Sequence, residues 1–261
     1  MKKTLLIAFI ICCFTAGDLW AQSGNYVFSG AEVNNFGVVD LATPGGQSWA
    51  TFRGELPGYY SATGTALYTG FSDNLANING YVKHYANIEN QNFSFPVGTG
   101  SDLRLLSISG TRTAVSEIAV AWILGDPTTT IDPTLPSAGL HNITMLGDSI
   151  LEVTNIGQWD WQSLSEDSEN LTVTVSIPDL SSFAAAEELR LVGWNGTQWV
   201  NLSGTSGATG NTEDSLLTGT MVSGITAITI ARSSALDTDN DGVFNFVELD
   251  SDNDACLDVV E

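Results

Sequence analysis

The last 25 residues, DTDNDGVFNFVELDSDNDACLDVVE, carry acidic side chains at offsets that could hold a divalent cation. Counted from Asp237 as position one, carboxylates fall at positions one, three, five and twelve, with a glycine at six and an asparagine at nine. Calcium takes six to eight hard oxygens at about 2.3 to 2.6 Å, and these offsets are those of a calcium-binding loop. The predicted ligands of this first loop are Asp237, Asp239, Asp241, the carbonyl of Val243, Asn245 through a water, and Glu248.

The same offsets recur thirteen residues later, at the very end of the given sequence. The predicted ligands of this second loop are Asp250, Asp252, Asp254, the carbonyl of Cys256, Asp258 and Glu261. Ala255 stands where the first loop has Gly242, and a left-handed backbone there costs a residue with a Cβ about 1 to 2 kcal/mol. We therefore expect the second loop to bind calcium more weakly than the first.

The two loops follow each other without room for flanking helices. Only Leu249 separates them, and the run before Asp237, ITAITIARSS, is typical of a strand. An EF-hand needs a helix on each side of its loop, so a linear array is the better description. Residues 236–261 resemble thrombospondin type 3 repeats, which implies successive loops wrapped around calcium with little hydrophobic core. The alternative is an acidic disordered tail that only keeps the protein soluble.

The first residues indicate where the protein works. Lys2 and Lys3 precede an apolar run from Leu5 to Phe14, which is typical of a secretory signal peptide spanning residues 1–21. No later stretch has the eighteen or so apolar residues that a membrane helix needs. The sequence therefore predicts an exported protein of the extracellular space or cell surface, without a membrane span.

The net charge of the chain limits the classes of partner that it can bind. The chain has 30 acidic and 8 basic residues, for a formal charge of −22. Nucleic acid and anionic membranes are poor partners for such a surface, whereas calcium ions are good ones. Cys256 lacks a partner once Cys12 and Cys13 leave with the signal peptide, so it either pairs outside the given sequence or stays a free thiol. With the abrupt end at Glu261, this suggests the front part of a longer protein with more repeats.

Between the two ends, residues 22–235 read as short strands rich in Val, Ile, Thr and aromatics, separated by Gly, Asn, Ser and Asp. In NLTVTVSI, Leu171, Val173, Val175 and Ile177 share one face, as in a half-buried strand. The sequence predicts an all-β protein, an antiparallel β-sandwich followed by a linear calcium-loop array. Residues 125–139 carry three prolines and form either a long surface loop or a linker that divides the sandwich.

Two local features of the sandwich are predicted in detail. Asn195-Gly196 supplies a two-residue type I′ hairpin turn that would pair Trp194 with Thr197 and Val192 with Trp199. SSFAAAEELR contains a single helical turn. No solenoid repeat is evident.

The sandwich also resembles secreted β-sandwich modules of surface proteins in gliding-type bacteria. The resemblance is carried by FSFPVG and by the tryptophan hairpin LRLVGWNGTQWVNL. It implies a structural or adhesive module, with a possible extracellular protein or glycan ligand, and supplies no catalytic residues. The alternative is a secreted carbohydrate- or polymer-binding protein that uses exposed Trp159, Trp161 or the Trp194 hairpin to stack on sugar rings.

Catalysis is not expected. LGDSILE resembles the serine block of GDSL-type esterases, which would make Ser149 a nucleophile. That chemistry needs a histidine base from a later segment, and His84 and His141 both precede Ser149. We therefore predict a non-enzymatic, calcium-binding structural or adhesion protein of the cell surface or extracellular matrix.

Overall fold

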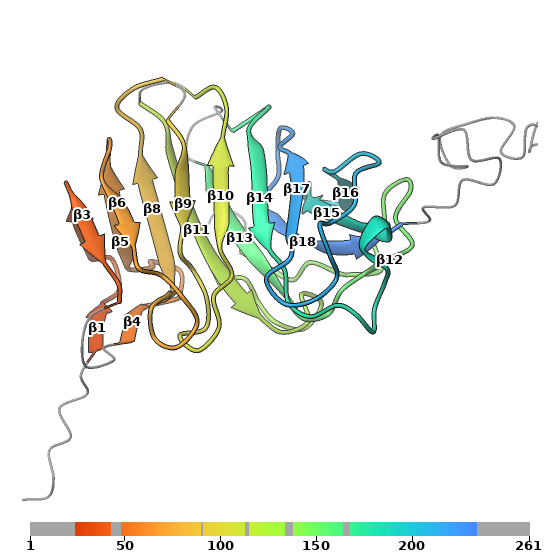
Figure 1. The fold of residues 1–261 in the computed structure, drawn as a ribbon, viewed down its shortest axis with the longest axis horizontal. Coiled ribbons are helices and arrows are strands. Elements are labelled where there is room, and N and C mark those ends of the chain that lie inside the picture. The colour runs from red at the N-terminus through yellow and green to blue at the C-terminus, as the bar shows by residue number, and fades with distance from the viewer. Residues whose placement is uncertain are drawn as a thin grey trace, which may run out of the picture.

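Eighteen strands and one 3-10 turn build the part of the chain that the computed structural model describes, residues 24–42, 48–89, 91–112, 115–133, 138–163 and 168–233. The protein is all-β, as predicted (Figure 1). The strands are β1 (Gly24–Val27), β2 (Glu32–Asn35), β3 (Val38–Asp40), β4 (Ser48–Thr51), β5 (Tyr59–Thr63), β6 (Leu67–Thr69), β7 (Ile78–Asn79), β8 (Tyr81–Tyr85), β9 (Phe93–Phe95), β10 (Leu106–Ser109), β11 (Glu117–Leu124), β12 (Glu152–Val153), β13 (Gly157–Ser163), β14 (Thr172–Ser176), β15 (Leu189–Trp194), β16 (Trp199–Asn201), β17 (Leu216–Thr220) and β18 (Ala227–Arg232). The predicted helical turn is confirmed as η1 (Ala186–Glu188).

The first nine strands form stacked turns of the chain in which like strands pair in parallel. β1 pairs with β4 and β4 with β7, β2 pairs with β5 and β5 with β8, and β3 pairs with β6. We call β1–β3, β4–β6 and β7–β9 the three rungs of this stack. The expectation of a purely antiparallel fold without a repeat is wrong here. Within a rung the chain moves from sheet to sheet, so β1 to β5 each pair with a strand one rung later rather than with their chain neighbour, whereas β6 and β9 are not paired with each other.

From β8 onward the pairing becomes antiparallel. β8 pairs in parallel with β5 on one side and antiparallel with β11 on the other, so one nine-stranded sheet joins both halves of the fold. Its order is β16-β15-β18-β13-β11-β8-β5-β2, with β12 paired to β18. A second, four-stranded sheet has the order β17-β14-β10-β9 and is antiparallel throughout. The rest of the strands form the three-stranded sheet β1-β4-β7 and the pair β3-β6.

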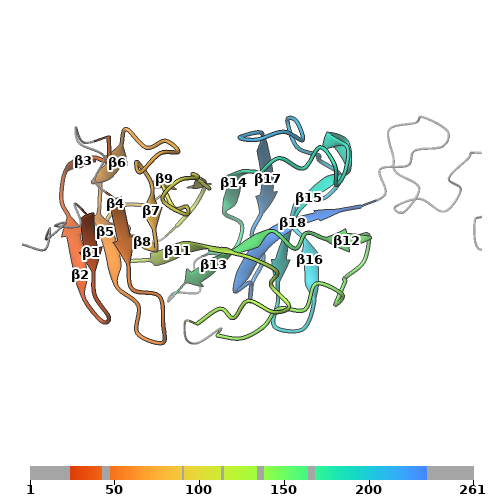
Figure 2. The same ribbon diagram turned by 90° about the horizontal axis from the view of Figure 1, so that it is seen from below.

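The main core lies between the four-stranded and nine-stranded sheets. Leu171, Val173, Val175 and Ile177 are all fully buried, which confirms the predicted alternation. They share one hydrophobic cluster with the tryptophans of β11 and β13 on the opposite sheet. Figure 2 shows β14 and β17 in one layer and β13 and β18 in the other. This facing arrangement is consistent with the predicted β-sandwich.

A smaller hydrophobic cluster covers the other face of the nine-stranded sheet. Val192, Trp194 and Trp199 pack there with Ile150, which precedes β12, and with Val153 on β12. The hairpin is confirmed, but its predicted register is wrong, because Trp194 pairs with Trp199 and the connection has four residues. The side-chain oxygen of Asn195 accepts hydrogen bonds from the amides of Thr197 and Gln198, at 3.0 Å each, and so closes the longer turn.

The proline-rich segment 125–139 lies between β11 and β13, which pair with each other across seven residues. The segment therefore joins neighbouring strands of one sheet. Within its described residues, Asp132 and Gly139 exchange backbone hydrogen bonds of 2.8 and 2.9 Å. No helix in the described residues is long and apolar enough to cross a membrane.

Candidate functional site

The predicted calcium ligands, Asp237 to Glu261, lie outside the residues that the structure describes. The same holds for the predicted signal peptide, residues 1–21, and for Cys256. Among the described residues, no group of three or more His, Cys, Asp or Glu side chains is placed to hold a metal ion. The double acidic motif therefore remains a prediction from the sequence.

The tryptophans considered for sugar stacking are packed inside the protein. Trp159 and Trp161 are fully buried in the main core, and Trp159 donates its indole N–H to the carbonyl of Arg104 at 3.0 Å. In the smaller cluster, Trp194 and Trp199 contact each other edge to face with ring centroids 5.4 Å apart. A ring buried on both faces offers no surface to a ligand. These four side chains therefore hold the sheets together.

Both histidines take part in buried hydrogen bonds. Arg112 donates to Nδ1 of His84 at 2.8 Å, and Nε2 of the same ring donates to the carbonyl of Gly64 at 3.0 Å. Burial lowers the pKa of His84, the hydrogen bond to the Gly64 carbonyl opposes the change, and the nearby Arg112 charge adds to it, so that the pKa lies at about 4. His141 bonds to Gln158 at 2.7 Å. Each histidine is thus a structural core residue.

Ser149 has none of the partners that a nucleophile needs. Its backbone adopts a positive φ of 64°, and the amide of Asn201 donates to its hydroxyl at 3.5 Å. Neither histidine is a hydrogen-bonding partner of Ser149. The resemblance to the GDSL block is therefore confined to the sequence.

A buried pair of carboxyl groups lies beneath the proline-rich segment. Asp160 on β13 and Asp132 are both fully buried and hydrogen-bond to each other. Oδ2 of Asp160 also accepts from the hydroxyl of Tyr81 at 2.9 Å and from the amide of Gln162 at 2.8 Å. Burial, followed by the Asp132 charge, raises the pKa of Asp160 well above its ordinary value. Because both carboxyl groups are fully buried, the pair has no access for a substrate, and it fastens the segment to the sheet.

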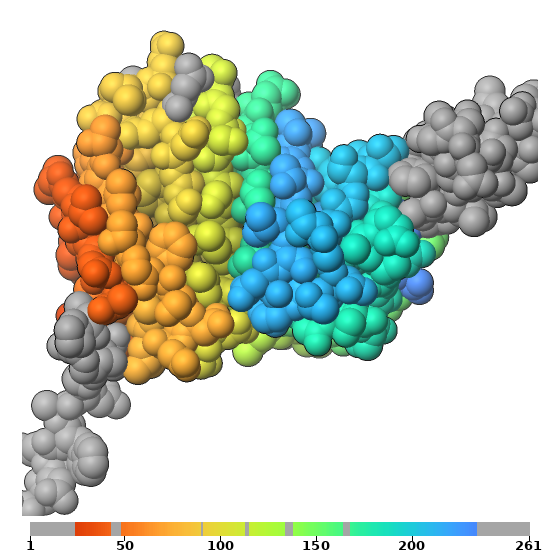
Figure 3. All heavy atoms as spheres, in the orientation of Figure 1, coloured from red at the N-terminus to blue at the C-terminus, as the bar shows by residue number. Residues whose placement is uncertain are grey.

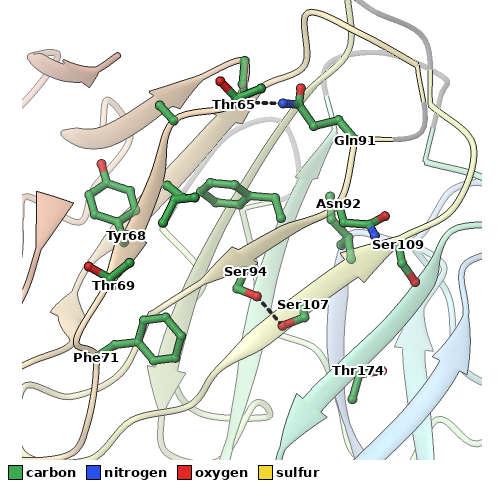
Figure 4. Close-up of a pocket in the computed structure, with 15 residues that line it drawn as sticks. Thr65, Tyr68, Thr69, Phe71, Gln91, Asn92, Ser94, Ser107, Ser109 and Thr174 are labelled. Atoms are coloured by element: carbon green, nitrogen blue, oxygen red, sulfur yellow. Dashed lines mark hydrogen bonds between the residues drawn. The ribbon is translucent and has the colours of Figure 1, made fainter. Parts of the chain in front are cut away.

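An open groove of about 570 Å³ is a candidate binding surface among the described residues. It lies where the pair β3-β6 ends at β6 and the four-stranded sheet ends at β9, because these two edges are not joined into one sheet. Figure 3 shows the face on which these strands lie, and Figure 4 shows the groove itself. Residues 64–69, 71, 91–94, 107–109 and 174 line it.

The lining combines hydroxyl and amide groups with an apolar floor. The hydroxyls of Ser94 and Ser107 hydrogen-bond to each other at 2.8 Å (Figure 4), and the exposed Asn92 also lines the groove. The ring of Phe71 forms part of the opposite wall (Figure 4), and the buried Phe93 also lines the groove. None of the described residues that line the groove is charged. Groups that both donate and accept hydrogen bonds, next to apolar surface, suit a neutral polar ligand.

Sequence reasoning missed this groove. Its walls come from four segments that are far apart in the chain, and each one alone reads as an ordinary strand or turn. The only local signal is the alternation of Ser and Thr in LSIS, LTVTVS and LLTGT, which sets hydroxyls on the outer face of three strands.

No protein-family model matches the chain, and neither a curated protein nor a solved structure shows a significant match to it.

Proposed function

We propose that this chain is a secreted, calcium-binding structural and adhesion protein that acts at the cell surface or in the extracellular matrix. The observation that carries the proposal is the double acidic motif, in which two sets of oxygen donors share the same offsets thirteen residues apart. A tail that served only for solubility would not need this spacing. The export signal and the all-β framework before the motif support the same role.

Calcium has a rigidifying role in this proposal. The stretch from Asp237 to Glu261 holds nine carboxylates and no Lys or Arg, so their mutual repulsion opposes folding until the ion neutralises it. Extracellular calcium modules have dissociation constants on the order of 0.1 to 1 mM. A tenfold excess of calcium over that constant adds about 1.4 kcal/mol per site. Abundant extracellular calcium then keeps the array ordered, and the array is not a signalling switch.

The alternative that the protein binds carbohydrate through exposed tryptophans is less well supported. It needs exposed faces on Trp159, Trp161 or the Trp194 hairpin, and these rings are buried. Their burial favours the structural and adhesive role. The proposed role is non-enzymatic, and the hydrogen bonding of Ser149 to Asn201 rather than to a histidine supports this part of the proposal.

Calorimetric titration of calcium into the purified full chain tests the proposal. We expect binding at millimolar calcium or below, with Asp239→Ala in the first loop weakening it more than Asp252→Ala in the second. Asp148→Ala is the control, because Asp148 is an exposed carboxylate outside the tail. Absence of heat together with a circular dichroism spectrum unchanged by a chelator would refute calcium binding, and equal effects of the two tail variants would refute the ranking of the loops.

A further inference from the structure

We propose that the groove between β6 and β9 binds a neutral polysaccharide chain. The inference deepens the adhesive part of the proposed function by naming the class of ligand, and it rests on different residues from the calcium part. It starts from the sheet break that leaves the groove open.

Charge gives the first argument. Asp, Glu, Lys and Arg make up 15% of the chain, and acidic residues outnumber basic ones by 30 to 8. The described lining of the groove nevertheless contains no charged side chain. A cationic ligand would find no counter-charge in the groove, and an anionic one would be repelled by the chain as a whole. The ligand that fits this lining is uncharged.

The second argument is the order of the hydroxyl groups. Ser94, Ser107, Thr174 and Thr218 face one another on successive strands β9, β10, β14 and β17. They are linked in pairs by hydrogen bonds, Ser94 to Ser107 at 2.8 Å and Thr174 to Thr218 at 3.0 Å. Neighbouring strands are about 4.8 Å apart. The row therefore leaves the groove and continues across the four-stranded sheet, as a polymer of repeating polyhydroxylated units requires.

A second row runs beside the first. Ser109 faces Thr172, and Thr172 faces Thr220, on the same three strands β10, β14 and β17. Each hydroxyl donates one hydrogen bond and accepts two, so both rows can match the mixed donors and acceptors of sugar hydroxyls. Charged side chains do not have both abilities, because a carboxylate only accepts hydrogen bonds and a Lys or Arg side chain only donates them. The two rows widen the polar surface next to the groove.

The apolar part of the groove supplies the third argument. Phe71 is half-buried and packs against the main core, which fixes its ring as a wall of the groove. The buried side chains of Phe93 and Ile108 lie in the floor. Pyranose rings have C–H faces that pack against aromatic surface while their hydroxyls point outward. A volume of about 570 Å³ lies within the usual range of about 300 to 1,000 Å³ for ligand sites.

An extended peptide fits the groove less well. A peptide that adds a strand to a sheet edge relies on a run of main-chain hydrogen bonds. The two edges that face the groove, β6 and β9, are only three residues long each. The side chains around them are hydroxyls and amides rather than the separate apolar pockets that peptide side chains occupy.

Affinity electrophoresis of the full chain through gels containing neutral polysaccharides, namely dextran, laminarin, mannan and xyloglucan, tests the proposal. Alginate serves as the charged polymer, and each gel is run with calcium and with a chelator. We expect at least one neutral polysaccharide to retard the protein, with binding weakened about tenfold by Phe71→Ala, which removes the aromatic wall. Ser107→Asp should weaken it at least as much, because a carboxylate must lose water against an uncharged ligand.

Matched controls isolate the groove. Phe28→Ala removes an exposed aromatic that packs on Tyr26 and does not line the groove, and Ser206→Asp adds a charge on an exposed loop, so both should bind like the parent protein. Thermal unfolding of every variant verifies the fold. The proposal is overturned if no neutral polysaccharide is retained, if alginate is retained equally, or if both groove variants bind like the controls. Retention of an extended peptide instead, lost in the same variants, would also overturn it. None of these outcomes bears on calcium binding by the tail.

Discussion

Replacement of Asp160 by asparagine should change how the stability of the protein depends on pH. In the folded protein Asp160 is fully buried against Asp132, and burial raises the pKa of its carboxyl above the value of about 3.9 in an unfolded chain. Between those two values the folded state holds a proton that the unfolded state has lost. Stability is therefore fully present below about pH 4 and declines as the pH rises toward the folded pKa.

The expected slope follows from proton linkage. One proton of difference between the two states costs about 1.4 kcal/mol per pH unit, so two pH units inside the window amount to about 3 kcal/mol. Asparagine keeps the shape of the protonated carboxyl. Its oxygen can accept from Tyr81 and Gln162, and its amide can donate to Asp132. The variant should lose this slope while it keeps the contacts.

Urea unfolding of the parent protein and of Asp160→Asn at pH 5, 6 and 7 measures the effect. The stability of the parent relative to the variant should fall as the pH rises through the window between the unfolded and the folded pKa of Asp160. Asp148→Asn is the matched control, because Asp148 is exposed and should leave the parent slope unchanged. Parallel stability profiles for the parent and Asp160→Asn would refute the raised pKa of Asp160.

Three further predictions concern other described residues. The pKa of His84 is about 4 in the folded protein and about 6.5 in an unfolded chain, so the free energy of unfolding should fall by about 1.4 kcal/mol per pH unit as the pH drops from 6.5 to 4. NMR titration of the ring measures the midpoint, and a midpoint near 6.5 would contradict the buried neutral form. Trp161→Ala should lower the free energy of unfolding in urea by about 3 to 5 kcal/mol because the ring is fully buried. Phe36 is 78% exposed, so Phe36→Ala should change it by less than about 0.5 kcal/mol. Comparable losses in the two variants would argue against the assigned core. Gly196→Ala should lower stability by about 1 to 2 kcal/mol, because the φ of 94° at this position is unfavourable for a residue with a Cβ. No other strain is expected, since no neighbouring heavy atom lies within 4 Å of the added Cβ. A larger loss in thermal unfolding would indicate a steric conflict.

The sequence was sufficient to predict the half-buried strands of the sandwich. The alternation from Leu171 to Ile177 follows from the two-residue period of a strand, and it holds because one face packs on the core. The hairpin at Asn195 was located correctly, but its register depends on the side-chain hydrogen bonds of Asn195 and on the contact between Trp194 and Trp199. Propensity alone does not determine such contacts.

The parallel stack could not be predicted in the same way. Its partners are separated by irregular distances, since Gly24 pairs with Ser48, Glu32 with Tyr59 and Val38 with Leu67. Several of its strands, such as EVNN, are short and polar, so they carry little hydrophobic signal. The groove was hidden for a related reason, because it exists only where two sheet edges fail to meet.

The stack has a consequence for how proteins of this design can change in length during evolution. Each rung contacts its neighbours through backbone pairing, and the first rung, β1 to β3, presents the outer edge of three sheets at once. Exposed Phe28 and Phe36 lie on this rung, at the end of the molecule away from β18 (Figure 1). Gain or loss of one rung at that end by duplication or deletion would shift the spacing between the chain's extremities and leave the hydroxyl rows of β10, β14 and β17 untouched.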